Sequence, residues 1–285
     1  MTDVLSFLWR RKPVRRPLDF QLVIGLAMLG GLFLMAIAAP LIAPYGPWSI
    51  SGAPYLPPLS EGHLLGTDTL GRDVFSGIIY GARISLLVGI AAAFAGICIG
   101  TVIGGIAGYF GGVVDDLLMR FTEFLQTMPG FVLALVLLAV MGPSIWSVVL
   151  AIALVSWPSI ARLMRAEFLS LRSREFILAS RVLGESHFKI VWSHMLPNAV
   201  GPIISVASLK VAAAILTEST ISFLGLGDAE KMSWGLMIGT SRALLRTAWW
   251  TSVFPGIALL LTVLALTLIA DGIGRSLNGR RQSML

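Results

Sequence analysis

Long apolar stretches alternate with shorter polar segments along the chain. A helix needs about 20 mainly apolar residues to cross the hydrocarbon core of a bilayer. Six stretches have this length and character, and they cover residues 22–42, 84–107, 117–141, 145–163, 199–223 and 249–270. The pattern predicts an all-α membrane protein with six transmembrane helices.

Two of these stretches contain residues that disturb a regular transmembrane helix. Arg120, Glu123 and Pro129 fall in the first half of the third stretch, which makes it the weakest of the six. Pro158 falls inside the fourth stretch, and a proline removes one helical hydrogen bond and clashes with the preceding turn. We therefore expect the fourth helix to be short and kinked.

The segment 174–198 lies between the fourth and fifth stretches and is too polar and basic for hydrocarbon. Its pattern predicts two short amphipathic helices that are separated at Gly184 and end at Pro197, because glycine suits the left-handed residue after a helix. Their apolar faces consist of Phe176, Ala179, Val182 and Leu183 in the first helix, and of Phe188, Val191, Trp192 and Met195 in the second. A membrane protein with such an element on its charged side presents a docking surface.

Two further segments are expected on the other side of the membrane. Residues 44–83 begin rich in proline and glycine, and Asp73 can then cap a helix that leads into the second stretch. Residues 223–248 are predicted to form a loop with one interfacial helix.

The distribution of charge predicts the orientation. Only 13% of the 285 residues are charged, against about 25% in soluble domains. With both termini in the cytoplasm, fifteen of the 21 lysines and arginines fall in cytoplasmic segments, and five fall outside: Arg72, Arg83, Lys231, Arg242 and Arg246. Because basic residues concentrate on the cytoplasmic side, segment 174–198 is predicted to be cytoplasmic. The net charge of +6 then needs no nucleic-acid partner.

Glycines recur at steps of four in the second stretch, at Gly96, Gly100, Gly104 and Gly108, and so form one ridge on a helix. Small residues let helix backbones approach closely in lipid, which favours a helix-packing surface. A backbone-lined substrate path is the alternative, and the two roles are compatible.

The fifth stretch carries Lys210 and Glu218, which lie about two turns apart. Ionisable groups at membrane depth are costly and face a protein interior or a cavity. They either neutralise each other or a partner's charge, or they line a polar translocation path.

The sequence offers little other chemistry. The three histidines, His63, His187 and His194, come without an accompanying ligand set, and Cys98 is the single cysteine. We therefore expect neither a metal site nor a disulfide. Since no Gly-x-Ser-x-Gly elbow occurs, catalytic residues are not expected either.

A phosphate-binding loop requires a lysine followed by serine or threonine. The four lysines, Lys12, Lys189, Lys210 and Lys231, are each followed by another residue type. Any ATP-driven transport therefore requires an ATPase on another polypeptide, and we expect the chain itself to be no enzyme.

Three sequence blocks resemble the inner-membrane permease subunits of the dipeptide/oligopeptide/nickel ABC importers, and in particular the C-type subunit of the pair. They are GTDTLGRDVFSGIIYGARISLLVG at 66–89, the loop at 175–198 with its Gly184 and Leu196-Pro197, and AAAILTESTISFLGLG at 212–227. The chain departs from the family pattern at 178–180, where Leu-Ala-Ser replaces Glu-Ala-Ala, and at Gly77, where arginine is common.

The resemblance implies a type I ABC importer permease. Such a chain pairs with a homologous B-type permease, docks on one or two ABC ATPase subunits that bind ATP and Mg, and receives substrate from a periplasmic solute-binding protein. The docking would use a coupling loop at 166–198, and within it Phe176, Ala179, Ser180, Gly184, Glu185, Ser186, Leu196 and Pro197. Dipeptides or oligopeptides are the implied cargo. Nickel, glutathione and opine-like solutes are alternatives with the same architecture, and an ion-coupled secondary transporter is a more distant one.

The expected organisation is that of a multi-pass protein of the bacterial inner membrane. It consists of a cytoplasmic arm at 1–21, a first helix at 22–43, a periplasmic segment at 44–83, a permease domain at 84–274 and a cytoplasmic tail at 275–285.

Overall fold

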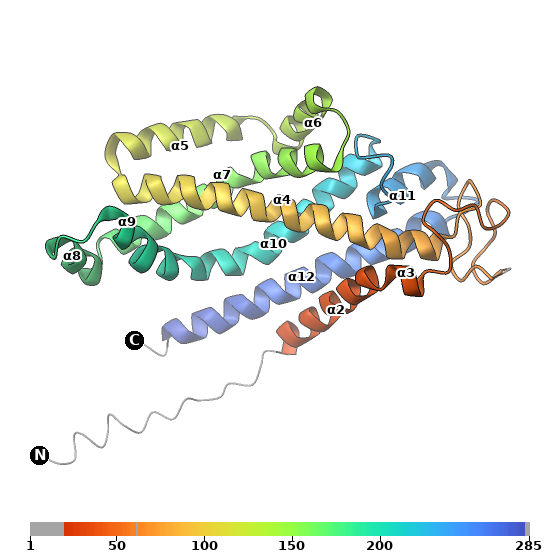
Figure 1. Ribbon diagram of the computed structural model, residues 1–285, viewed down its shortest axis with the longest axis horizontal. Coiled ribbons are helices and arrows are strands. Elements are labelled where there is room, and N and C mark those ends of the chain that lie inside the picture. The colour runs from red at the N-terminus through yellow and green to blue at the C-terminus, as the bar shows by residue number, and fades with distance from the viewer. Residues whose placement is uncertain (1–19, 61, 283–285) are drawn as a thin grey trace, which may run out of the picture.

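The computed structural model describes residues 20–60 and 62–282, with side chains up to Ser276, and the regular elements of this part of the chain are helices. Nearly all of the expected N-terminal arm, and part of the C-terminal tail, lie outside the described residues. Figure 1 shows an elongated bundle in which the long helices run beside one another along its long axis.

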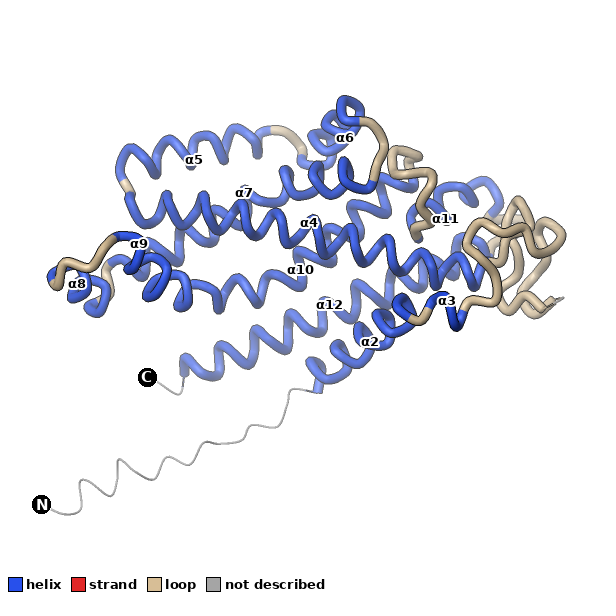
Figure 2. The backbone as a smooth tube through the Cα atoms, in the orientation of Figure 1, coloured by secondary structure: helices blue, strands red, loops and turns tan. Residues whose placement is uncertain are grey.

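The helices follow one another with mostly short connections. In chain order they are α2 (Phe20–Ile37), α3 (Ala39–Ile42), α4 (Val74–Phe110), α5 (Gly112–Thr127), α6 (Gly130–Met141), α7 (Ile145–Arg172), α8 (Glu175–Val182), α9 (His187–Lys189), a π-helical turn (Ile190–Met195), α10 (Leu196–Phe223), α11 (Trp234–Ser241), a 3₁₀ turn (Arg242–Leu244) and α12 (Trp250–Gln282). Most loops, drawn in tan in Figure 2, lie at the two ends of the bundle, and a short one joins α5 to α6 away from both ends. We call the two ends the α8 end and the α11 end.

Five helical segments of the described chain are long and apolar enough to cross a membrane, and a bent pair can supply a sixth span. The five are Phe20–Ile37, Val74–Phe110, Ile145–Arg172, His187–Phe223 and Trp250–Ser276. The sixth consists of α5 and α6, which meet at an angle of 86°. The all-α membrane fold is therefore confirmed with five such spans, and the count reaches the expected six when the bent pair is taken as one span.

The bend between α5 and α6 follows from Pro129. The residue before a proline is driven out of the helical region, and Met128 accordingly has φ −85° and ψ 137°. Pro129 then lacks the N–H that would continue the helical hydrogen bonds, so α6 starts afresh at Gly130. The weakness expected of the third stretch therefore takes the form of a broken helix.

Two expectations about prolines were wrong. The fourth helix is not short, since α7 has 28 residues and continues past Pro158 to Arg172. The second helix of the polar loop does not end at Pro197, because helical structure continues from His187 to Phe223. The π-helical turn at Ile190–Met195 is wider than an α-helical turn, and it accommodates a proline ring that would otherwise clash with the turn before it.

The predicted cap at Asp73 is confirmed. Its Oδ2 accepts hydrogen bonds from the backbone N–H of Ser76 at 2.7 Å and from the Ser76 hydroxyl at 2.7 Å. From this cap α4 runs without interruption for 37 residues. It therefore includes both the helix expected after Asp73 and the second apolar stretch. The interfacial helix expected in 223–248 is α11.

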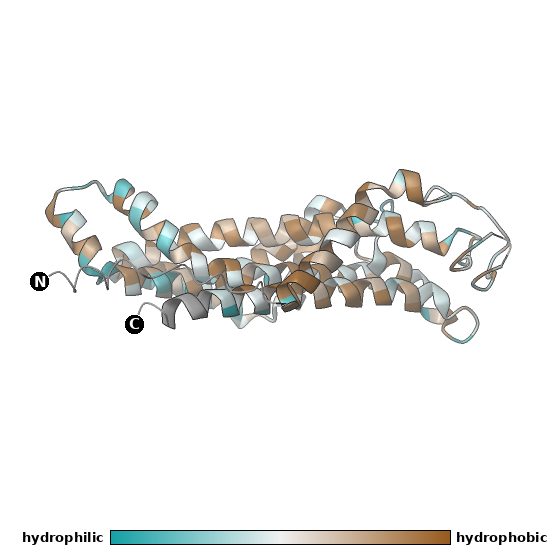
Figure 3. Ribbon diagram, turned by 90° about the horizontal axis from the view of Figure 1, so that it is seen from below, coloured by the Kyte–Doolittle hydropathy of each residue, from teal (hydrophilic) through white to brown (hydrophobic). Residues whose placement is uncertain are grey.

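Hydrophobic residues dominate the middle of the bundle, and hydrophilic residues become frequent toward the α8 end (Figure 3). Exposed apolar side chains cover the long helices, among them Leu34, Phe94, Leu117 and Leu260. This surface is typical of a protein whose middle lies in lipid.

The glycine ridge of α4 packs against α7. A Cβ atom added at Gly100 would lie 2.6 Å from Cβ of Ile160 and 2.7 Å from the carbonyl oxygen of Trp157. One added at Gly108 would lie 2.6 Å from Cβ of Phe168, and Gly96 and Gly104 meet α7 in the same way. The four glycines therefore bring two helix backbones into direct contact.

We expect Gly100→Leu to separate α4 from α7, because overpacking a close helix contact costs about 1–3 kcal/mol. The measurement is the apparent melting temperature of the purified protein in detergent. Gly31→Leu on α2 is the matched control, since nothing lies within 4 Å of a Cβ added there. Equal melting temperatures for the two variants would contradict this account of the ridge.

Candidate functional site

The polar loop between α7 and α10 forms the α8 end of the molecule (Figure 1). Gly184 has φ +74°, the left-handed conformation expected for it. Its N–H donates to the carbonyl of Arg181 at 3.0 Å, and the N–H of Glu185 donates to the carbonyl of Ser180 at 3.1 Å. These two hydrogen bonds make a Schellman motif, which ends α8 and turns the chain sharply.

Side chains then fix the start of the next helix. The hydroxyl of Ser186 accepts a hydrogen bond from the N–H of Lys189 and caps α9. Glu185 accepts hydrogen bonds from Lys189 Nζ at 2.6 Å and from His194 Nε2 at 2.9 Å. The hydrogen bond from Lys189 is the main reason that the pKa of Glu185 is lowered, so this residue stays a carboxylate.

Several large apolar side chains of this loop are exposed. The exposed fractions are 87% for Val182, 76% for Phe188 and 62% for Trp192, and the rings of Phe188 and Trp192 stack with centroids 6.1 Å apart. Of the other residues predicted for docking, Phe176, Ala179, Gly184, Ser186 and Pro197 are exposed, and Ser180, Glu185 and Leu196 are half-buried. The loop therefore presents an apolar face that the described chain leaves uncovered.

Three other apolar residues attach the loop to the bundle. Ile177, Ile190 and Met195 are buried in a cluster with Phe168 of α7. The sequence placed Phe188, Trp192 and Met195 on one face of the second helix, and this was wrong for Met195. Met195 is buried within the π-helical turn, whereas the two aromatic side chains are exposed. Sequence periodicity missed the anchors Ile177 and Ile190. Ile190 begins the π-helical turn, which shifts the helical repeat, whereas Ile177 lies in α8, a short α-helix in which Phe176 and Ala179 are exposed.

The end of α4 also contacts this loop. The hydroxyl of Tyr109 lies 2.6 Å from Nδ1 of His187, and the guanidinium of Arg181 lies 5.3 Å from the centre of the Tyr109 ring. Arg172 of α7 donates a hydrogen bond to the carbonyl of Phe110 at 3.3 Å. The loop is therefore connected to α4 by polar contacts as well as to the bundle by its buried anchors, and Arg172 joins the ends of α7 and α4 beside it.

Lys210 and Glu218 occupy different environments on α10. Lys210 is half-buried and donates a hydrogen bond from Nζ to the hydroxyl of Ser159 on α7 at 2.6 Å. It lines a cavity of about 150 Å³ between α6, α7 and α10. Among the described residues no ion pair joins Lys210 to Glu218.

Glu218 is 2% exposed and is surrounded by hydroxyl groups. Ser222 donates to its Oε1 at 2.7 Å, and Ser85 and Ser219 donate to its Oε2 at 3.4 and 3.3 Å. The hydroxyl oxygen of Ser85 also accepts from the N–H of Trp234 at 3.3 Å. This cluster ties α4, α10 and α11 together, which favours a structural role for Glu218.

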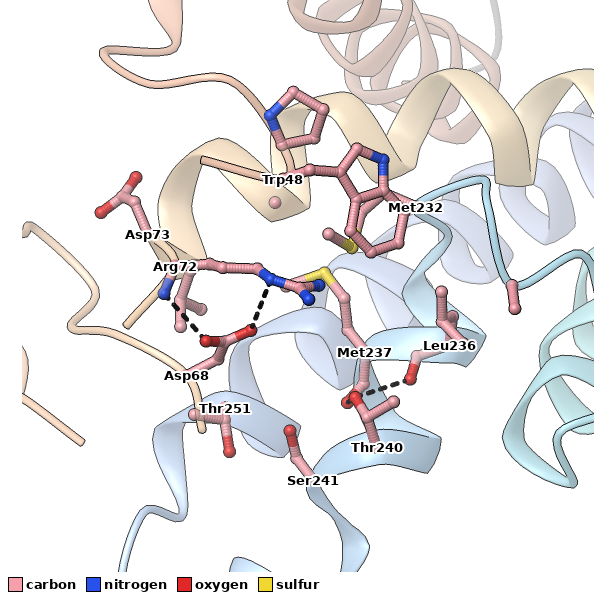
Figure 4. A pocket seen from close by; sticks show the side chains of 14 residues that line it. Trp48, Asp68, Arg72, Asp73, Met232, Leu236, Met237, Thr240, Ser241 and Thr251 are labelled. Carbon is pink, nitrogen blue, oxygen red and sulfur yellow. Dashed lines mark hydrogen bonds and ion pairs between the residues drawn. The ribbon is translucent and has the colours of Figure 1, made fainter. Parts of the chain in front are cut away.

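A second cavity, of about 210 Å³, lies at the α11 end. Figure 4 shows Arg72 between the Trp48 ring and Asp68, with Met237 beside it. The guanidinium lies 4.7 Å from the centre of the Trp48 ring, and its Nε lies 4.0 Å from an oxygen of Asp68. Gly77 leaves room here, because a Cβ at this position would lie 2.8 Å from Cε of Met237.

The three histidines are spread over the molecule. His63 is buried, and its Nδ1 lies 2.9 Å from Oδ1 of Asp73, so it holds the segment before α4 onto the cap of that helix. His187 contacts Tyr109, and His194 contacts Glu185. The described residues contain no group of three or more histidine, cysteine, aspartate or glutamate side chains placed to hold a metal ion.

The described chain is a helical bundle with five apolar spans, a bent pair that can form a sixth, and a polar loop at one end, as expected of a multi-pass membrane protein. Residues 100–283 match the family of binding-protein-dependent transport system inner membrane components. The chain belongs to this family, and the expected resemblance to ABC-importer permeases is confirmed.

Individual relatives agree with this assignment. A dipeptide transport system permease protein of Alkalihalophilus pseudofirmus is 38% identical over 92% of this chain and 86% of its own length. A glutathione transport system permease protein of Pectobacterium atrosepticum is 39% identical over 79% of this chain and 75% of its own length. An inward-facing structure of the MetNI methionine ABC transporter shares the fold, with a TM-score of 0.58 and 16% identity over 70% of this chain and 95% of that one.

We expect Glu218→Leu to destabilise the protein, because it leaves the three serine hydroxyls without their acceptor. An unsatisfied buried polar group costs about 1–3 kcal/mol. The check is thermal unfolding in detergent, with Thr220→Val as the control, since that exposed hydroxyl bonds only the carbonyl of Leu216 in its own helix. An unchanged melting temperature for Glu218→Leu would show that the hydroxyl cluster contributes nothing.

Proposed function

We propose that this chain is the permease subunit of an ATP-driven importer of short peptides. A dipeptide permease and a glutathione permease, both transporters of short peptides, are among its similar relatives. The chain pairs with a second, homologous permease and forms the translocation path with it.

The uncovered apolar face of the polar loop carries this proposal. Val182, Phe188 and Trp192 are exposed at the α8 end, where hydrophilic residues are frequent (Figure 3). Exposed apolar patches of this kind mark protein interfaces. The partner that fits is an ABC ATPase subunit, which binds the ATP and Mg that drive transport.

The loop is built to transmit movement. Ile177, Ile190 and Met195 fix it to the bundle, and the helix that starts at His187 continues to Phe223 without a break. When the ATPase subunits close, a displacement of the loop therefore moves α10, and with it the cavity at Lys210. This is a two-state change that a partner protein biases.

The orientation proposed from the charge distribution puts the α8 end in the cytoplasm. The α11 end, with the segment before α4, then faces the periplasm and receives substrate from a solute-binding protein. The protein is a multi-pass component of the bacterial inner membrane with both termini in the cytoplasm.

This orientation predicts the labelling of introduced cysteines in intact cells. In a Cys98→Ala background, Lys231→Cys should react with an impermeant thiol reagent, and Ser173→Cys should react only after the cells are opened. Both positions are exposed, so access to the side chain is not limiting. The opposite labelling pattern would overturn the orientation.

Docking predicts that Gly184→Asp abolishes ATP-driven peptide uptake while the protein still inserts. A non-glycine residue in the left-handed conformation costs roughly 1–2 kcal/mol, and the new carboxylate would enter the contact with the ATPase. Nothing within the chain lies within 4 Å of a Cβ at Gly184, so the bundle itself can accommodate the side chain.

Gly225→Asp is the matched control for this experiment. Gly225 has φ +81°, ends α10 in the same hydrogen-bonded motif at the opposite end of the bundle, and also has nothing within 4 Å. Co-purification of the ATPase should fail only for Gly184→Asp. Equal co-purification of the ATPase with the two variants would refute docking at this loop.

A further inference from the structure

The Lys210 ammonium is placed at the middle of the bundle without a counterion. Position 210 is central in α10, and its partner Ser159 is central in α7. An ammonium has three N–H donors, and the structure records one hydrogen bond for it within the described chain. A charge at membrane depth is costly unless it is paired or solvated, so the remaining donors need an acceptor.

A second cation increases this imbalance. Arg162 lies about one turn beyond Ser159 on α7, and its positive charge repels that of Lys210. Neither residue has a carboxylate within ion-pair distance in the part of the chain that the structure describes. Arg162 itself is exposed, so the case for anion binding rests on Lys210, whose ammonium forms no ion pair among the described residues.

The cavity beside Lys210 has a lining suited to a small amphipathic molecule. Phe131, Ile152 and Val155 provide apolar surface, and Ser156 and Thr217 provide hydroxyl groups. A third cavity, of about 330 Å³, adjoins the cavity beside Lys210, because Gly130 and Val155 line both.

The broken helix pair makes these cavities. The cavity of about 330 Å³ lies where α5 and α6 meet at 86°, beside Met128 and Gly130. Irregular backbone at membrane depth is tolerated where it is buried in protein or lines a cavity. The break and the unpaired ammonium therefore belong to one polar site within the membrane.

We propose that Lys210 binds the terminal carboxylate of a peptide in transit, with Ser159 holding the ammonium in place and the apolar lining receiving a side chain. This inference rests on the proposed import of short peptides and names the contact that the permease itself makes with its cargo. A carboxylate accepts charge-assisted hydrogen bonds from an ammonium, and these are about twice as strong as neutral ones.

The test uses the assembled transporter in phosphatidylcholine proteoliposomes, with alanylalanine as the transported probe. Lys210→Met should lower uptake at least about tenfold, as expected for a lost charge-assisted hydrogen bond, and Lys210→Arg should retain most of it. Thr220→Val changes an exposed side chain of the same helix outside this cavity and is the matched control, which should transport like the wild type. Assembly with the partner permease should be unchanged in all three variants.

A binding measurement identifies the group that Lys210 recognises. Equilibrium dialysis of the complex without its solute-binding protein should show tighter binding of alanylalanine than of its C-terminal amide. This preference should disappear in Lys210→Met.

Several results would overturn the inference. They are normal uptake in Lys210→Met, loss of assembly in that variant, an uptake defect confined to phosphatidylglycerol membranes, and the lack of an acid-over-amide preference in the wild type. The third result would assign Lys210 to a lipid phosphate. Failure of the wild-type complex to import alanylalanine would instead refute the proposed function, so the two failures are distinguishable.

Discussion

The direct backbone contact between α4 and α7 is the interaction on which both candidate sites depend. Four glycines on α4 remove the side chains that would hold the two helices apart, so α7 is fixed against the longest helix of the bundle. Ser159 on α7 holds Lys210, and the same helix ends at Arg172, where the polar loop begins. A shift of α7 would therefore change the cavity and the position of the loop together.

The second connection between the two sites is the helix that contains α10. It begins in the polar loop at His187, passes through a π-helical turn, carries Lys210 in its middle and ends near the hydroxyl cluster of Glu218. π-Helical turns inside longer helices are frequent at functional sites, and this one joins the loop to α10 without interrupting the helical structure. In the proposed transport cycle, a displacement of the loop reaches the cavity through this continuous helix.

Local rules predicted the parts of the structure that depend on neighbouring residues. The cap at Asp73 and the left-handed Gly184 each follow from a few adjacent residues, whereas Pro129 only marked the third stretch as weak and did not predict its break. The sequence could not show that Glu218 is enclosed by serines, because Ser85 is 133 residues away, or that Tyr109 contacts His187 across 78 residues. Such pairs depend on how helices pack, and the wrong expectation for Pro197 likewise arose from a π-helical turn that propensity does not reveal.

The account requires that the exposed apolar face of the polar loop contacts the ATPase. The most direct measurement replaces Val182 with a photo-crosslinking amino acid in cells that express the complete transporter, with Ile50 at the opposite end as the comparison. Both side chains are exposed, at 87% and 73%. Irradiation should join position 182, and not position 50, to the ATP-binding subunit. The absence of that product at position 182, or its appearance at position 50, would contradict the account.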